Sequence, residues 1–222
     1  MKISSLLNIG RGVTAIIGGG GKTTLMYTLA RELEKNGAVV ICTSTHILVP
    51  ESFPLVTLGA EELRTALAEH AAVCAGTRAE NGKLTASGMS FEELARLADY
   101  VLVEADGSRN LPLKAHAEHE PVIPLNAQRV VLVVGADGLG KPIAEACHRP
   151  ELYAFLAGAS VDDAVTPELA ARVIAAEGLG DRVYINKVET AEELDTAQRL
   201  AELLRCPSVL GSLKNGVYTK WR

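Results

Sequence analysis

The stretch VTAIIGGGGKTTLM, residues 13–26, decides the fold. Its first five residues are apolar and mostly β-branched, which is typical of a strand buried on both faces of a sheet. From Leu25 onward, apolar residues recur at helical spacing, so the stretch predicts a strand, a glycine-rich turn and a helix in succession. Glycine lets backbone N–H groups approach an oxygen closely, and a helix N-terminus adds free donors and partial positive charge. The sequence therefore predicts an anion-binding turn.

The residue types in this turn favour a nucleoside triphosphate. Lys22 would reach the β- and γ-phosphates, the Thr23 hydroxyl would bind Mg²⁺, and Thr24 could contact the α-phosphate. The usual loop has a further glycine where Ile16 stands, so only the shorter pattern G-x-x-G-K-T is present, as in the Mur-type ligases. A glycine turn without a ligand is the alternative, but consecutive glycines lose much backbone entropy on ordering. We expect the backbone cradle to consist of Gly18, Gly19, Gly20 and Gly21.

Composition narrows the class of protein. With 222 residues, of which 48% are hydrophobic, the chain can bury a full core, and residues 1–222 are expected to form one domain. A net charge of −5 without a basic block argues against nucleic acid and anionic membranes as partners. The four cysteines form no CxxC pair, which favours free thiols over a disulfide framework or a zinc site. Without a signal peptide or a membrane-spanning run, we expect a cytoplasmic protein.

Strands that alternate with helices predict a three-layer α/β fold of the P-loop NTPase type, with a mostly parallel sheet and helices on both faces. Further buried strands are expected at 38–42, at 129–135 and at 207–211. An Asn81-Gly82 pair between the short runs 72–75 and 83–85 predicts a hairpin excursion at the sheet edge, within residues 71–88. The helices expected to begin at Pro150 and after Thr166 show no chemistry and are interpreted as cover for the sheet.

A second motif follows the apolar strand that begins at Tyr100. It continues as Glu104, Ala105, Asp106 and Gly107, and an acid at a strand end beside a phosphate loop holds Mg²⁺ directly or through water. Two acids compete for this role. We assign Glu104 to the metal, and Asp106 to orienting water or a second metal oxygen.

The loop after this strand is rich in basic and titratable side chains. Arg109 and Lys114 could neutralise charge that develops on a transferred phosphoryl group. His116 and His119 are weaker candidates, because lone histidines are more often surface or capping groups.

The segment Thr43-Ser44-Thr45-His46 follows another predicted strand, so it should lie at the same sheet edge. Thr45 or Ser44 could contribute to the Mg²⁺ site, and His46 could sense the γ-phosphate or a substrate. A Ser/Thr turn without a ligand is the alternative.

A third motif, Asn186-Lys187-Val188-Glu189, follows the strand that begins at Val183. It is similar to the N-K-x-D element with which GTPases recognise guanine, so Asn186, Lys187 and Glu189 are candidates for contact with the base. Glutamate is one methylene longer than aspartate, so the choice between ATP and GTP stays open.

Taken together, GGGGKTT, TSTHI, EADGSRNLPLKAHAEHEPVIP, GLGKP, HRPE and INKVE resemble the YqeC family along nearly the whole chain. That family is described as accessory proteins of selenium-dependent molybdenum hydroxylases. The resemblance implies a P-loop NTPase fold and a role in the maturation of a molybdenum hydroxylase or its cofactor.

Three functions are consistent with these patterns. The first is a Mg²⁺-dependent nucleoside triphosphatase, using ATP or GTP, in which Lys22, Asp106 and Arg109 act in catalysis. The second is a small-molecule kinase or an ATP-dependent ligase, although the chain is too short for the domains that Mur-type ligases carry. The third is a binding or chaperone module in which the nucleotide only times release.

Overall fold

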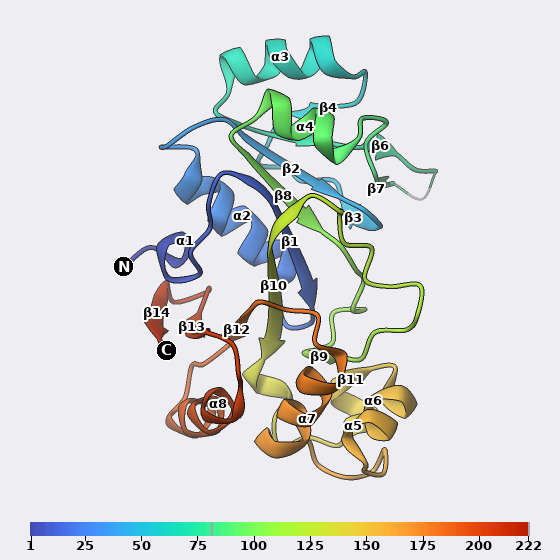
Figure 1. The fold of residues 1–222 in the computed structure, drawn as a ribbon, viewed down its shortest axis with the longest axis vertical. Helices are drawn as coiled ribbons and strands as arrows, with labels where there is room; N and C mark the ends of the chain where they lie inside the picture. The colour runs from blue at the N-terminus through green and yellow to red at the C-terminus, as the bar shows by residue number, and fades with distance from the viewer. Residues whose placement is uncertain (81, 222) are drawn as a thin grey trace.

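A computed structural model of the protein describes residues 1–80 and 82–221. Its centre is a nine-stranded sheet in the order β14-β13-β12-β10-β1-β8-β2-β5-β4, and only the pair β13–β14 is antiparallel (Figure 1). The prediction of an α/β fold with a mostly parallel sheet is confirmed. The strands are β1 Gly12–Gly18, β2 Val39–Thr43, β4 Leu55–Val56, β5 Ala72–Ala75, β8 Tyr100–Glu104, β10 Ala127–Gly135, β12 Arg182–Asn186, β13 Ser208–Ser212 and β14 Val217–Lys220.

Helices cover both faces of this sheet, because successive residues of β1 point to opposite sides. Ile16 packs with apolar residues of α2, whereas Ile17 packs in a second cluster with α5, α6, α7 and α8. A third cluster joins Val13 to α3 and α4. The helices are α1 Ile3–Leu6, α2 Lys22–Leu33, α3 Ala60–Glu69, α4 Phe91–Leu97, α5 Ile143–Ala146, α6 Pro150–Ala157, α7 Pro167–Glu177 and α8 Ala191–Leu203, with a 3₁₀ turn η1 at Ala136–Gly138.

Several helices begin at residues with clear start signals in the sequence. Ser90 and Thr190 each form a capping box with the glutamate three residues later. Proline occupies the first turn of α6 and of α7. The first long helix, α2, ends at Leu33, and residues 34–36 form a turn. None of the described helices is long and apolar enough to cross a membrane.

Pairing at the edges differs from the prediction. The run 72–75 is β5 and lies in the main sheet, parallel to β2, so it is not the first strand of the expected hairpin. That hairpin is formed by β6 (Thr77–Arg78) and β7 (Lys83–Thr85), and β7 also pairs with β3 (His46–Leu48). Asn81 of the predicted turn lies outside the described residues.

The sequence patterns did not predict some short or terminal strands. The final strand β14 pairs with β13 although its tail carries no clear alternation. A small parallel ladder of β9 (Leu113–Lys114) and β11 (Cys147–His148) was also not expected. Two-residue strands are too short to show periodicity, so only the pairing itself defines them. This ladder lies at the edge of the main sheet where β8 ends.

The carboxyl ends of the parallel strands meet at one edge of the sheet, as expected for a ligand crevice. In the register of β1 and β8, Glu104 lies beside Ile16, two residues before the glycine loop. On the other side of β8, Glu104 lies beside Thr43. The register therefore brings the three polar strand ends predicted from the sequence into one place.

Candidate functional site

The glycine loop joins the end of β1 to the start of α2. The N–H groups of Gly18, Gly19 and Gly20 donate to Asp106 Oδ2 (2.8 Å), the Val133 carbonyl (2.9 Å) and the Leu111 carbonyl (3.1 Å). The backbone N–H groups in the first half of the loop therefore already donate hydrogen bonds to the protein. In contrast, the backbone N–H groups of residues 21–24 find no acceptor among the described residues. These unpaired donors at the start of α2 are the open part of the predicted anion-binding turn.

Close backbone contact explains why the loop needs glycine. A Cβ atom on Gly19 would lie 2.6 Å from the Leu111 carbonyl oxygen, closer than real Cβ atoms come. Gly21 has a φ of 121°, which a residue with a side chain rarely adopts. The glycines thus allow the close local packing of the loop.

Lys22 is folded back over the loop and is almost fully buried. Its Nζ donates to the Gly18 carbonyl (2.7 Å) and lies 3.0 Å from Asp106 Oδ1 and 3.9 Å from Glu104 Oε1. Both predicted acids therefore lie at the predicted lysine. A bound phosphate would have to draw Nζ away from these partners.

The predicted metal ligands Thr23 and Glu104 are in direct contact. The Thr23 hydroxyl donates to Glu104 Oε2 at 2.7 Å, across 81 residues of sequence. Burial raises the pKa of the Glu104 carboxyl and the charge of Asp106 acts in the same direction, while Lys22 and the Thr23 hydrogen bond oppose the rise.

Asp106 is completely buried at the centre of a charged cluster. Its Oδ2 accepts from Gly18 and lies 2.6 Å from His116 Nε2 and 3.7 Å from Lys114 Nζ. Burial opposes ionisation of Asp106, but the His116 hydrogen bond and the charges of Lys22 and Lys114 together outweigh it and lower the pKa of its carboxyl. Two carboxylates separated by one residue are thus driven to opposite protonation behaviour.

His116 is not the surface group that the sequence suggested. Its side chain is 2% exposed and bridges Asp106 through Nε2 and Glu177 through Nδ1, at 2.6 Å and 2.9 Å. Although burial alone would lower the pKa of this imidazole, the hydrogen bonds and charges of Asp106 and Glu177 raise it. His116 is therefore held between two carboxylates that favour its protonated form.

Sequence reasoning missed Glu177, the last residue of α7, and Arg149, which precedes α6. Glu177 accepts from the backbone N–H and the ring of His116, and Arg149 Nε donates to Glu120 Oε1 at 2.7 Å. Both helices cover the sheet as predicted, and the residues at one end of each also contact charged side chains near the glycine loop. Helical periodicity gives no sign that a terminal residue reaches a buried histidine, so only the fold reveals these roles.

Other candidates lie near the same edge with fewer contacts. Arg109 is exposed, and the described residues offer it no hydrogen-bond or ion-pair partner. The Thr45 hydroxyl lies 3.4 Å from that of Thr43, whose own hydroxyl donates to the backbone carbonyl of Glu104. The buried Ser44 Oγ has no hydrogen-bond partner. A metal contact of Thr45 stays a prediction.

The third motif reaches the loop through the backbone. Asn186 Nδ2 donates to the Gly20 carbonyl (2.8 Å), and its Oδ1 accepts from the Leu213 N–H and the Tyr184 hydroxyl. The described residues give the second N–H of the Asn186 amide no acceptor. Contact with a base remains a prediction for all three motif residues. Of the other two, Lys187 is paired with Asp137 and Glu189 with Ser212 and Lys214.

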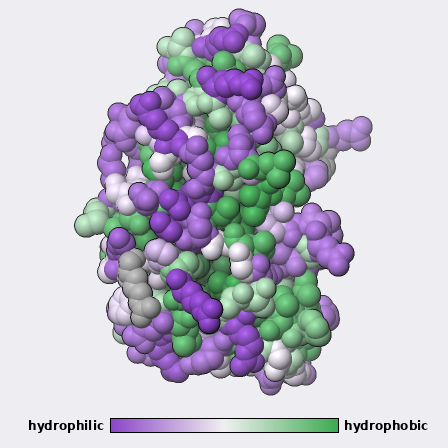
Figure 2. Space-filling view, in the orientation of Figure 1, coloured by the Kyte–Doolittle hydropathy of each residue, from purple (hydrophilic) through white to green (hydrophobic). Residues whose placement is uncertain are grey.

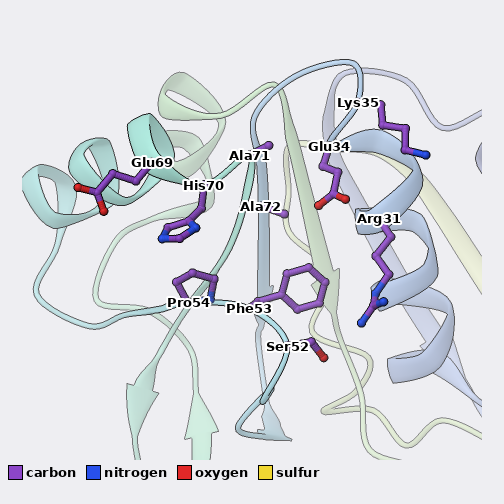
Figure 3. Close-up of a pocket in the computed structure, with 10 residues that line it drawn as sticks. All are labelled: Arg31, Glu34, Lys35, Ser52, Phe53, Pro54, Glu69, His70, Ala71 and Ala72. Carbon is purple, nitrogen blue, oxygen red and sulfur yellow. The ribbon is translucent and has the colours of Figure 1, made fainter.

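A cavity of the molecule lies elsewhere. A cavity of about 620 Å³ opens at the amino ends of the strands, between the end of α2, the chain before β4 and the start of β5 (Figure 3). Its lining carries charged residues of both signs, among them Arg31, Glu34 and Glu69. None of the predicted site residues lines it.

A family model described as YqeC protein matches residues 14–151, which is more than half of the chain. The chain belongs to the YqeC family. It is 35% identical over 161 residues to the uncharacterized protein YqeC of Escherichia coli strain K12. The match covers 68% of this chain and 62% of that protein, so the chain spans less than two thirds of the length of this relative.

The YqeC match contains most of the site described above. It includes the glycine loop, Glu104, Asp106, His116 and Arg149. Glu177 and Asn186 lie beyond its last residue, although they contact His116 and the glycine loop. The site of this YqeC family member is therefore assembled from the matched region and from later elements of the chain.

Proposed function

We propose that the protein binds a nucleoside triphosphate with Mg²⁺ and hydrolyses it. One observation carries this proposal: Lys22, Thr23, Glu104 and Asp106 converge directly beside unpaired backbone N–H groups at the start of α2. Phosphoryl transfer requires positioning and charge neutralisation rather than covalent protein chemistry, and these groups supply both.

The donor set fits Mg²⁺ better than a metal that needs a protein cage. The described residues contain no group of three or more His, Cys, Asp or Glu side chains arranged to hold a metal ion. Magnesium is usually held by one or two protein oxygens together with substrate phosphates and water. The Thr23 hydroxyl and the Glu104 carboxylate, 2.7 Å apart, are such oxygens, and the unpartnered Ser44 Oγ lies in the segment after β2. When bound, Mg²⁺ would neutralise charge on the phosphates.

Each charged residue has a defined task in this proposal. Lys22 would leave the Gly18 carbonyl to bind phosphate oxygens. Asp106, kept ionised by its basic neighbours, would hold Lys22 and the loop in position and orient the attacking water through Lys22 or directly. Arg109, which has no partner in the described part of the chain, is free to approach the transferred phosphoryl group.

The proposal also covers the base of the nucleotide and the biological partner. Asn186, Lys187 and Glu189 would contact the base of ATP or GTP. Coupling of hydrolysis to the maturation of a molybdenum hydroxylase or its cofactor depends on what is said of the YqeC family. The four free cysteines are consistent with action in the cytoplasm. A nucleotide-gated binding module would use the same site without rapid turnover.

Isothermal titration with ATP, GTP and CTP in the presence of Mg²⁺, followed by phosphate-release assays, tests the proposal. We expect one nucleotide to bind the wild-type protein, and Lys22→Ala to weaken its binding at least about a hundredfold, since a buried charge-assisted contact is lost. Lys35→Ala, an exposed lysine beyond the other end of α2, is the matched control and should bind as the wild type does. Nucleotide binding that is absent, or equal in both variants, would refute the proposal.

A further inference from the structure

Basic side chains gather beside the glycine loop, around the small ladder of β9 and β11. In this ladder Lys114 lies directly beside His148. Arg149 follows His148 in the chain, and Arg109 lies at the tip of the loop that leads from β8 to β9. We call Arg109, Lys114, His148 and Arg149 the basic cluster.

The basic cluster carries more positive charge than its acids balance. Glu120 accepts from Lys114 (2.7 Å) and from Arg149 (2.7 Å), and the second carboxylate near Lys114, Asp106 at 3.7 Å, also pairs with Lys22. Arg109 has neither a hydrogen bond nor an ion pair to any described residue. This local excess stands out in a chain of net charge −5.

The excess of positive charge affects the pKa of the His148 imidazole. Burial lowers the pKa of its imidazole first, and the charges of Lys114, Arg149 and Arg109 lower it further, against a smaller opposite effect of Glu120. His148 is therefore neutral at physiological pH and can both donate and accept hydrogen bonds. Its Nδ1 is buried and has no partner among the described residues.

Two basic residues of the cluster also sit on unfavourable backbone. Arg109 (φ 50°) and its neighbour Asn110 (φ 63°) form the tip of a turn closed by the bond from the Leu111 N–H to the Ser108 carbonyl. Arg149 has a φ of 63°. Non-glycine residues in the left-handed region are uncommon and gather at ligand sites, where surrounding contacts hold them.

We propose that the basic cluster binds the oxyanion group, a phosphate or a carboxylate, of a second small-molecule substrate. The inference rests on the proposed nucleotide site and names the class of molecule that would lie beside it. The two sites share Asp106, because its Oδ1 lies 3.0 Å from Lys22 and its Oδ2 lies 3.7 Å from Lys114. An anion held by Arg109, His148 and Arg149 would therefore be placed next to the phosphate loop, as the acceptor in a small-molecule kinase must be.

The test uses the 222-residue protein with Lys22→Ala, so that the phosphate loop contributes little. Inorganic phosphate and malonate are titrated calorimetrically at low ionic strength. We expect one of them to bind, and Arg109→Asn together with His148→Gln to weaken that binding about tenfold or more, because charge-assisted hydrogen bonds are lost. Asparagine tolerates the left-handed backbone at position 109, and neither side chain holds another residue through a described bond, so both changes should preserve the fold. Arg205→Asn, at an exposed arginine, is the matched control.

A second measurement follows the His148 imidazole by nitrogen NMR, where we expect a shift when the anion is added. Preference for phosphate assigns a phosphorylated substrate, and preference for malonate a carboxylate. Anion binding that is absent in the Lys22→Ala protein, or equal with and without the Arg109 and His148 changes, would overturn the inference. Failure of the proposed nucleotide site would show separately, as nucleotide binding indifferent to Lys22→Ala.

Discussion

The two ends of the central sheet hold their charges in opposite ways. At the carboxyl ends, the side chains of Asp106, Lys114 and His116 are 0%, 0% and 2% exposed and interlock through ion pairs. At the amino ends, the 620 Å³ cavity of Figure 3 is lined by charged side chains, yet no ion pair joins them in the described part of the chain. This cavity is thus at the end with less constrained charge.

This difference teaches where to look for function in this protein. Burying a charge is unfavourable unless it is paired. A buried set of ion-paired charges therefore requires the rest of the fold to hold each charge beside its partner. The charged side chains around a solvent-open cavity do not need partners held in fixed positions. Figure 2 also shows hydrophobic surface in the middle of this face, at the level of the chain that leads into β10, but nothing in the structure indicates what would cover it. The buried charges are therefore the stronger guide.

The largest effect should come from Asp106→Asn, which tests the carboxyl end directly. Removing this charge leaves Lys22 and Lys114 buried with less compensation, and breaking a buried pair typically destabilises by about 3–5 kcal/mol. Urea unfolding measures the change. The exposed Asp195→Asn variant is the control and should unfold as the wild type does. A loss below about 1 kcal/mol at Asp106 would show that its buried charges are not mutually dependent.

Asn186→Ala should have the next largest effect. It leaves the Gly20 carbonyl, the Leu213 N–H and the Tyr184 hydroxyl without their partner, and buried unpaired groups cost about 1–3 kcal/mol. We expect a loss of about 2–3 kcal/mol in urea, together with weaker nucleotide binding, since the loop is less firmly held. Asn215→Ala, at an exposed asparagine of the C-terminal region, should change neither quantity. If Asn186→Ala changed neither the unfolding free energy nor the nucleotide affinity, the glycine loop would be held in place without the contact from β12.

His116→Gln should show a smaller, pH-dependent effect. Because the pKa of His116 is raised on folding, its stabilisation is complete below the ordinary value near 6.5 and is lost as pH rises through the folded value. The difference in unfolding free energy between wild type and variant should therefore be largest at about pH 6, on the order of 1–2 kcal/mol, and shrink toward pH 9. Urea unfolding at several pH values measures it. A difference that grows with pH would contradict an imidazolium between Asp106 and Glu177.

The sequence predicts much of the fold because its signals are local. The apolar run before the glycine loop, the capping boxes at Ser90 and Thr190 and the prolines of α6 and α7 each determine a boundary without tertiary information. The main sheet follows, since alternation of strands and helices restricts the topology. The run 72–75 shows the limit: its residues suit a strand in either sheet, and only packing against β2 decides its place.

The convergence of side chains could be predicted where one motif supplies several polar residues in sequence, as in Lys22 and Thr23, or where an acid ends a strand, as Glu104 does. It was not predicted where a partner comes from far along the chain. Glu177 meets His116 across 61 residues, and the basic cluster depends on a ladder of two-residue strands. Such contacts depend on how helices dock on the sheet, which no local pattern encodes.

The smallest effect is expected at the cavity, and it decides whether the comparison between the two ends holds. Arg31 lies in the last turn of α2, nine residues after Lys22, so the helix places it about 14 Å from the glycine loop. That separation exceeds the Debye length of about 8 Å at physiological salt, so the charge of Arg31 should not be felt at the loop. Arg31→Ala should therefore leave nucleotide affinity unchanged and shift the unfolding free energy by no more than about 0.5 kcal/mol. Titration and urea unfolding on the same sample check both values, and a tenfold loss of nucleotide affinity would mean that the open cavity, and not only the buried charges, takes part in binding.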